Sequence, residues 1–129
     1  MPKNIPSISD AEWQVMEVVW SAEPEPIAAN DVVAALESTT DWKDKTIRTM
    51  LNRLVNKGAL GFEADGKRYL YKPKVARDAC VRVQSRSFLS RVFGGATGAA
   101  LLHFVEEHDL TPAEVEQLRR VLATRRKER

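Results

Sequence analysis

The apolar residues between Asp44 and Gly58 recur with the period of an α-helix. They occupy positions 47, 50, 51, 54 and 55, which is the spacing of one helical face. At roughly 100° per residue, the opposite face carries Lys45, Thr49, Asn52, Arg53 and Asn56, with no carboxylate. Side chains of these types contact base edges and phosphates. The segment predicts a DNA-reading helix with an Asp44 N-cap and a Gly58 stop.

The positive charge of the chain is concentrated around this segment. The 129 residues carry a formal net charge of +2, but residues 1–41 hold one Lys against eight acids. Residues 42–74 hold nine Lys or Arg against three acids, and residues 75–129 hold ten against seven. A basic region confined to the predicted reading helix and the residues after it is typical of a nucleic-acid-binding surface.

Two helices are predicted before the reading helix. Ser9 and Glu12 form a capping box, so we expect a helix from about Asp10 to Trp20. A shorter second helix, capped by Asn30 or by the residues just before it, should end near residues 38–40.

A β-hairpin is predicted after the reading helix. Apolar residues flank Asp65-Gly66, a strong signal for a two-residue turn, and Lys67 and Arg68 follow it. Three helices followed by a hairpin is the order of a winged helix-turn-helix. Residues 1–74 are therefore predicted to form a winged-helix DNA-binding domain whose hairpin touches the DNA backbone.

Residues 75–129 are predicted to form a three-helix dimerisation domain. The apolar pattern indicates helices from about Val75 to Phe93 and from Thr97 to about His108, and Thr111 with Glu114 forms a capping box before a last helix. The apolar stripes are too broad for three such helices to cover alone, so we expect a homodimer. Its two reading helices would lie roughly 34 Å apart on palindromic DNA. The predicted fold class is mainly α with a small β-hairpin.

Several motifs together resemble one known family. They are ISDAEWQVMEVVW at residues 8–20, DKTIRT at residues 44–49 with Leu54 and Lys57-Gly58, then Phe88-Leu89 and Gly94-Gly95. These motifs resemble the penicillinase repressors of the BlaI/MecI type, within the BlaI/MecI/CopY superfamily of winged-helix repressors, and the likeness covers about Ile8 to Leu122. It implies a dimeric repressor that binds double-stranded operator DNA. The copper-responsive branch ends in a cysteine-rich motif that this chain lacks, which argues against copper sensing through thiolates.

The reading face, the basic hairpin and the resemblance together define the expected sites. The expected DNA-binding residues are Lys43, Lys45, Thr46, Arg48, Thr49, Asn52, Arg53, Lys57, Lys67, Arg68 and Tyr69. The expected dimerisation residues are Phe88, Leu89, Val92, Leu101, Leu102, Phe104, Val105, Leu118, Val121 and Leu122.

The resemblance also implies a mode of release. In the β-lactam-responsive branch, which controls antibiotic resistance, a membrane-bound sensor metalloprotease leads to cleavage of an Asn-Phe bond in the dimer domain. The matching bond here is His103-Phe104, so the Phe is kept and the Asn is replaced. We expect this bond to be the cleavage site, and the inducing signal stays open.

Several classes of function are disfavoured by what the sequence lacks. Cys80 is the sole cysteine, which rules out an intrachain disulfide and fits a reducing compartment. Val92 to Val105, the longest uncharged stretch, is too short and polar to span a bilayer, and no apolar signal core lies within residues 1–7. No catalytic motif is present. We expect a cytoplasmic protein that is not an enzyme, needs no cofactor or metal and does not insert into membranes.

Two alternatives stay open at this point. A winged-helix protein-interaction module could use the same basic helix to bind an acidic partner. A metal- or redox-responsive regulator could use His103, Glu107, His108 or Cys80.

Overall fold

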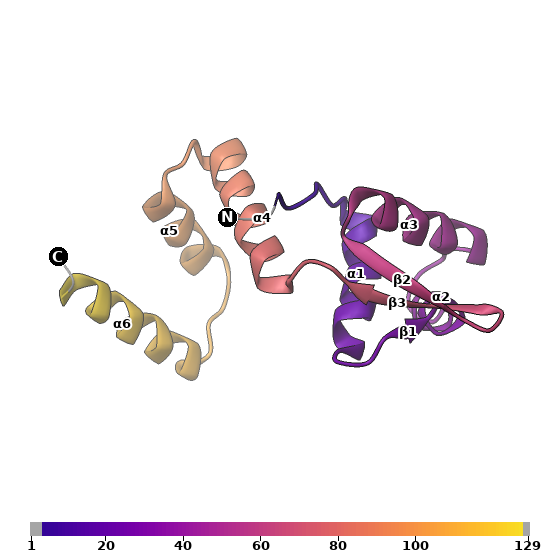
Figure 1. The fold of residues 1–129 in the computed structure, drawn as a ribbon. Helices are drawn as coiled ribbons and strands as arrows, with labels where there is room; N and C mark the ends of the chain where they lie inside the picture. Colours follow the sequence, from indigo (N-terminus) through magenta and orange to yellow (C-terminus); the bar gives the residue numbers. More distant parts are fainter. Residues whose placement is uncertain (1–3, 128–129) are drawn as a thin grey trace. The chain divides into compact units, whose positions relative to one another are not determined.

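The computed structural model describes residues 4–127, in which helices predominate (Figure 1). In chain order the elements are α1 (Asp10–Ala22), β1 (Ile27–Ala28), α2 (Ala29–Glu37), α3 (Asp44–Lys57), β2 (Leu60–Asp65), β3 (Arg68–Pro73), α4 (Arg77–Phe93), α5 (Thr97–Glu107) and α6 (Pro112–Lys127). The predicted fold class, mainly α with a small hairpin after three helices, is confirmed. Residues 1–3 of the stretch considered for a signal core lie outside the described residues.

Helix α1 begins with the predicted capping box. The Glu12 N–H donates to the Ser9 hydroxyl at 3.1 Å, and the Ser9 N–H donates to the Glu12 carboxylate at 3.0 Å. These two bonds satisfy amide groups that have no partner within the helix. The helix continues past its predicted end at Trp20 to Ala22.

The Glu12 carboxylate also joins the start of α1 to the end of α3. Glu12 is buried, with a relative exposure of only 3%. Lys57 Nζ donates to Glu12 Oε1 at 2.5 Å and to the Ser7 carbonyl oxygen at 2.8 Å. Burial raises the pKa of the Glu12 carboxyl, but the hydrogen bonds from Lys57 and Ser9 and the Lys57 charge outweigh burial and lower the pKa from its ordinary 4.5. The buried charge is retained because it has these partners.

The starts of α2 and α3 differ in part from the predicted caps. Helix α2 has Ala28 at its N-cap, one of the residues just before Asn30, and no side chain caps it. The prediction of Asp44 as the N-cap of α3 is wrong, because Lys43 holds that position and Asp44 is the first helical residue. The Asp44 carboxylate instead accepts a hydrogen bond from Arg48.

The inner face of α3 follows the predicted apolar period. Its buried residues are Ile47, Met50, Leu51 and Leu54. They pack with residues of α1 and α2 in one hydrophobic core. Gly58 ends the helix with a φ of 86°, a left-handed conformation that glycine adopts without strain. The chain then turns directly into β2.

The sheet has three antiparallel strands in the order β1-β3-β2. Strand β1, which is not predicted from the sequence, pairs Ile27 with Tyr71. In the hairpin, Asp65 pairs with Arg68, so the turn consists of Gly66 and Lys67. The predicted Asp65-Gly66 turn is therefore one position too early. Gly66 has a φ of 66°, and glycine at the first central position is favoured in tight hairpin turns.

The chain divides into two compact units, with the division between Val83 and Gln84 inside α4. The boundary predicted from the sequence lies between residues 74 and 75. The first turns of α4 group with the N-terminal unit because Cys80 is 1% exposed in its core and Arg77 pairs with Glu17 at 2.8 Å. Trp20 Nε1 also donates to the Val75 carbonyl at 3.0 Å.

The C-terminal unit has little core of its own. The rings of Phe88, Phe93 and Phe104 lie with centroids 5.9 to 6.2 Å apart. Ala100 is the buried residue of α5, and α6 has none as far as Lys127. The predicted capping box before α6 is present, because the Thr111 N–H donates to Glu114 and the Glu114 N–H donates to the Thr111 hydroxyl.

No single helix within residues 4–127 has the length and apolar character needed to cross a bilayer. Helices α4 and α5 reach those values only as a pair, with a bend of 89° between them. The longest uncharged stretch of the sequence runs across the break between these two helices.

We predict that Glu12→Gln destabilises the fold at pH 7 and that the effect fades in acid. Removing the charge leaves the Lys57 ammonium without its ion pair, which should lower the free energy of unfolding by about 2 kcal/mol, less than for a fully buried pair because Lys57 is partly exposed. Because the folded-state pKa of Glu12 is lowered, its contribution is fully present above 4.5 and is lost as pH falls through the folded-state value. Urea unfolding at pH 7 and at about pH 3 measures the difference between wild type and variant.

Glu25→Gln is the matched control, since Glu25 is exposed. It should leave the free energy of unfolding within about 0.5 kcal/mol of wild type. A Glu12→Gln deficit that is equally large at both pH values would show that the charge is not responsible.

Candidate nucleic-acid interface

The outward face of α3 presents most of the residues expected to contact DNA. Arg48 is half-buried, and the other members of the set on this face and at its start are exposed: Lys43, Lys45, Thr46, Thr49, Asn52 and Arg53. Trp42, just before the helix, is partly buried and packs against the hydrophobic core. The inner face and Trp42 thus hold α3 on the core while its polar face is open to solvent.

Arg48 is held by side chains from two helices. Its Nε donates to Asp44 Oδ1 at 2.6 Å, one turn earlier in α3. Its Nη2 donates to Asn30 Oδ1 at 2.5 Å, in the first turn of α2. Neither Asp44 nor Asn30 is among the residues predicted to contact DNA. Asn30 lies 18 positions away along the chain, and nothing in the spacing of residues indicated that it would meet Arg48.

Lys57 differs from the other lysines of the expected set because its ammonium is already bonded inside the fold. It donates to buried Glu12 and to the Ser7 carbonyl. Lys45, by contrast, carries an exposed side chain at the other end of α3. Lys57 therefore fixes the helix end, whereas Lys45 is available to an external anion.

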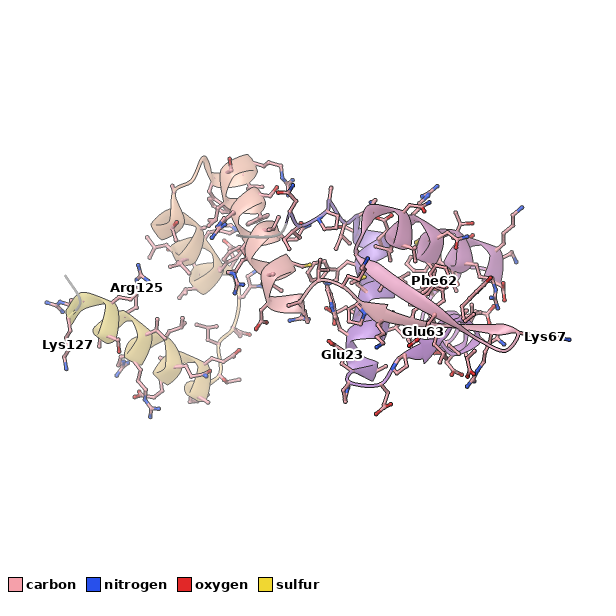
Figure 2. The ribbon with its side chains drawn as sticks, viewed as in Figure 1. Glu23, Phe62, Glu63, Lys67, Arg125 and Lys127 are labelled. Carbon is pink, nitrogen blue, oxygen red and sulfur yellow. The ribbon has the colours of Figure 1, made fainter. Side chains whose placement is uncertain are left out.

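The hairpin carries a cation at its tip. Lys67 occupies the turn and points away from the rest of the N-terminal unit (Figure 2). Arg68 pairs with Asp65 across the turn at 3.1 Å. Half of the expected positive charge of the hairpin is thus balanced by a neighbouring carboxylate.

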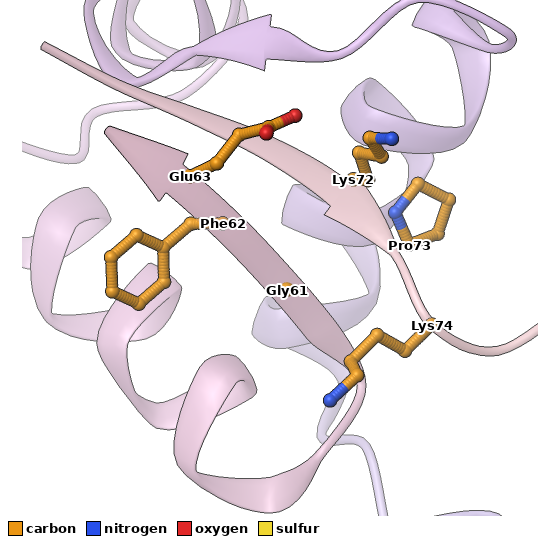
Figure 3. Close-up of a pocket in the computed structure, with 6 residues that line it drawn as sticks. All are labelled: Gly61, Phe62, Glu63, Lys72, Pro73 and Lys74. Atoms are coloured by element: carbon orange, nitrogen blue, oxygen red, sulfur yellow. The ribbon is translucent and has the colours of Figure 1, made fainter. Parts of the chain in front are cut away.

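The two faces of the hairpin differ in chemistry. Phe62 and Glu63 project from opposite faces of β2 (Figure 3). Phe62 lies across from Tyr71 in the register, and its ring meets Tyr69 edge-on with centroids 5.0 Å apart. Phe62 and Tyr69 are 50% and 51% exposed, which is unusual for large aromatic residues beside a core.

A hollow lies between α3 and the aromatic face of the hairpin. Its volume is about 320 Å³, and it is lined by Arg48, Asn52, Phe62, Tyr69 and Tyr71. Burial raises the pKa of the Tyr71 hydroxyl; the Arg48 charge opposes this and Tyr69 adds to it, with a raised pKa as the net result. The reading helix and the hairpin therefore present guanidinium, amide and aromatic groups to a common space.

The opposite face of the hairpin has a second, smaller hollow (Figure 3). Its volume is about 270 Å³, and Lys72, Lys74 and Glu63 are among the residues that line it. The Lys74 side chain packs over Gly61, where a Cβ would meet it at 3.4 Å. The Glu63 carboxylate shares this hollow with the two lysines, which makes this face less suited to a polyanion than the outward face of α3.

The residues expected at a dimer interface are largely exposed in the C-terminal unit. Phe88 and Leu89 are half-buried. The exposed members are Val92, Leu101, Leu102, Phe104, Val105, Leu118, Val121 and Leu122. The His103-Phe104 bond lies inside α5, where the Phe104 carbonyl accepts a hydrogen bond from the His108 N–H at 3.0 Å.

The residues considered for metal or redox sensing are not assembled into a site. Within residues 4–127, no three His, Cys, Asp or Glu side chains are placed to hold a metal ion. The Cys80 thiol is buried, and burial raises its pKa. A buried thiol of raised pKa is poorly reactive because the thiolate is the reactive form.

Comparison with known proteins identifies one family. A family model described as penicillinase repressor matches residues 8–124. The penicillinase repressor of Bacillus licheniformis is 39% identical over 120 residues, which cover 93% of this chain and 92% of that protein. The methicillin resistance regulatory protein MecI of Staphylococcus aureus (strain N315) is 35% identical over 115 residues, which cover 89% of this chain and 92% of MecI.

Solved structures match the N-terminal part of the chain. The solution structure of the DNA-binding domain of the repressor BlaI has a TM-score of 0.53 and 43% identity, covering 59% of this chain and 90% of that domain. The monomeric form of Bacillus licheniformis BlaI, solved in complex with the blaP half-operator, has a TM-score of 0.52 and 43% identity, covering 60% of this chain and 92% of that chain.

Proposed function

The chain is a DNA-binding transcriptional repressor of the penicillinase repressor family, and we propose that it binds a two-fold symmetric operator as a homodimer. The family match confirms the resemblance predicted from the sequence motifs. One observation carries the proposal: a relative with 43% identity was solved with a half-operator in its monomeric form. One protomer at one half-site implies two protomers on a whole operator. Members of this family are DNA-binding regulators, in agreement with the expectation that the chain is not an enzyme.

In this proposal α3 enters the major groove and the hairpin contacts the backbone beside it. Arg48 and Arg53 carry planar guanidinium groups, each of which can donate two hydrogen bonds to a guanine. Lys45 and Lys67 carry exposed point charges that suit phosphates, which position a protein without specifying sequence. The remaining proposed contacts are Lys43, Thr46, Thr49, Asn52, Arg68 and Tyr69. Lys57 serves the fold, because its ammonium is bonded to Glu12.

The exposed apolar side chains of the C-terminal unit support the homodimer. Leu102 is 65% exposed and Leu122 is 59% exposed, while α6 has no buried residue as far as Lys127. Apolar surface of this extent marks an interaction site. A second copy of the chain supplies the same surface, as a two-fold interface requires.

We further propose that the repressor acts in the cytoplasm and is released by cleavage of the His103-Phe104 bond by a membrane-bound sensor metalloprotease. The named relatives include a penicillinase repressor and a methicillin resistance regulator, so control of β-lactam resistance is the corresponding role. A protease needs an extended backbone, and α5 offers one only after local opening. Ala100 is the buried residue of this helix, so few side chains resist that opening.

The first experiment measures sequence preference. A duplex selected by the wild-type protein from a randomised library is compared with a random duplex of the same length by gel shift at several salt concentrations. We expect a palindromic selected sequence and a steep fall in affinity with salt, since phosphate contacts release counterions. Arg48→Ala should weaken binding to the selected duplex by about 1–3 kcal/mol more than binding to the random duplex.

Equal losses on both duplexes would defeat the assignment of Arg48 to base reading. A wild-type protein that selects no sequence would instead favour a protein-interaction module. Glu25→Gln, remote from the interface, serves as the control variant.

The homodimer is tested by placing a charge in the apolar surface. Leu102→Asp should shift the mass in solution from dimer to monomer and weaken binding to the full palindrome, because a carboxylate buried without a partner is strongly unfavourable. Thr97→Asp is the matched control, because an acid in the first turn of α5 is compatible with the helix dipole. Sedimentation measures the mass; a monomeric wild type at micromolar concentration would refute the dimer.

Cleavage is tested with the active sensor protease and the full chain. We expect a fragment with Phe104 as its first residue, identified by mass spectrometry. His103→Asn, which restores the residue found at this bond in the β-lactam-responsive branch, should be cleaved at least as fast. If both proteins stay intact, release by cleavage at this bond is wrong.

A further inference from the structure

We propose that Asn30 and Asp44 are positioning residues that fix the Arg48 guanidinium so that its free end reads a guanine. This inference rests on the proposed function and assigns a specificity role to two residues that have no part in the predicted contact set. Arg48 Nε donates to Asp44 at 2.6 Å, and Nη2 donates to Asn30 at 2.5 Å. The acceptors come from the first turns of two different helices, α3 and α2.

Counting donors shows what these contacts leave available. A guanidinium has five N–H bonds in a fixed plane. Asp44 takes the Nε–H and Asn30 takes one N–H of Nη2, which leaves two on Nη1 and one on Nη2. These three N–H bonds have no acceptor within residues 4–127. The end of the fork, formed by Nη1 and Nη2, therefore keeps the paired donors that guanine O6 and N7 accept.

The two acceptors reduce the freedom of a long side chain. An arginine that samples many rotamers loses conformational entropy when it binds a base. Arg48 is 43% exposed and would otherwise be free to move on the helix surface. Because the acceptors lie on both α2 and α3, they fix the direction of the Arg48 side chain relative to the N-terminal unit. Arg48 therefore loses less conformational entropy when it binds DNA.

The charge of Asp44 favours a base contact over a phosphate contact. Its carboxylate balances Arg48 and, beside DNA, repels the phosphates. A balanced guanidinium gains little from a phosphate, whereas its geometry still suits guanine. Because specificity is a difference between two affinities, a carboxylate that weakens non-specific binding raises it.

The decisive variant is Asn30→Ala, which leaves the net charge unchanged. Binding to the wild-type-selected duplex should fall roughly tenfold, the scale of one good bidentate pair, while binding to a random duplex should change less than about twofold. Substituting each G·C pair of the selected duplex in turn should reveal one position whose preference for guanine is lost in the variant. The salt dependence should stay that of wild type, because no phosphate contact is removed. Gln14→Ala, which removes an exposed amide from α1, is the control.

A double-mutant cycle separates positioning from direct contact. In an Arg48→Ala background, adding Asn30→Ala should cause no further loss on the selected duplex. An additive loss would overturn the proposal, because it would mean that Asn30 contacts DNA by itself. Asp44→Ala should bind the random duplex more tightly and lose preference at the same base pair, and Asp44→Asn, which keeps an acceptor, should recover part of that preference.

Thermal unfolding tests whether the Asn30 and Asp44 variants lose DNA binding only because their fold is destabilised. The Arg48 contacts are exposed, so the melting temperatures of the Asn30 and Asp44 variants should match wild type within a few degrees. One outcome refutes the positioning proposal and leaves the proposed function intact. In it, the wild type selects a sequence, Arg48→Ala loses the preference for that sequence, and Asn30→Ala retains it. A wild type without any preference refutes the proposed function instead.

Discussion

One buried carboxylate sets the position of the reading helix. Glu12 completes the cap of α1 and binds the ammonium at the end of α3, so the same side chain defines where one helix starts and where the other stops. Gly58 and β2 follow directly, and the hairpin therefore depends on that end point as well. The apolar core would tolerate small sliding of α3, whereas a buried charge with a single cationic partner does not. The ion pair between Glu12 and Lys57 therefore fixes which face of α3 is exposed to solvent.

Local signals in the sequence predicted the elements well, and contacts between distant residues escaped it. Both capping boxes, the apolar period of α3 and the Gly58 stop depend on residues within about one helical turn of each other, and all are present. Strand β1 exists only because β3 pairs with it, and two residues show no period. Asn30, one of the two partners of Arg48, lies 18 positions away along the chain, and Glu12, the acidic partner of Lys57, lies 45 positions away. A helical wheel therefore identified the cationic face but could not tell which cations were already bonded.

The two units of the chain depend on different sources of stability. The N-terminal unit closes a core that includes residues from α1, α2, α3, the hairpin and the start of α4. The C-terminal unit gathers its phenylalanine rings and leaves many leucine and valine side chains in water. If a second copy covers that surface, the order of this unit is linked to protein concentration, whereas the order of the N-terminal unit is not.

The tight turn at Gly66 and Lys67 limits how the length of the hairpin can vary. Side chains alternate between the two faces of a strand, so inserting one residue in each of β2 and β3 exchanges the faces between the insertions and the turn. Phe62 and Tyr69 would then leave the side of α3, and carboxylates such as Glu63 would face the guanidinium end that the Asp44 and Asn30 contacts leave open. Inserting two residues in each strand keeps both the alternation and the two-residue turn, and it lengthens the hairpin. Related chains that keep this arrangement should therefore differ in hairpin length by multiples of four residues, and the reach of the hairpin along DNA would change in steps of one strand repeat.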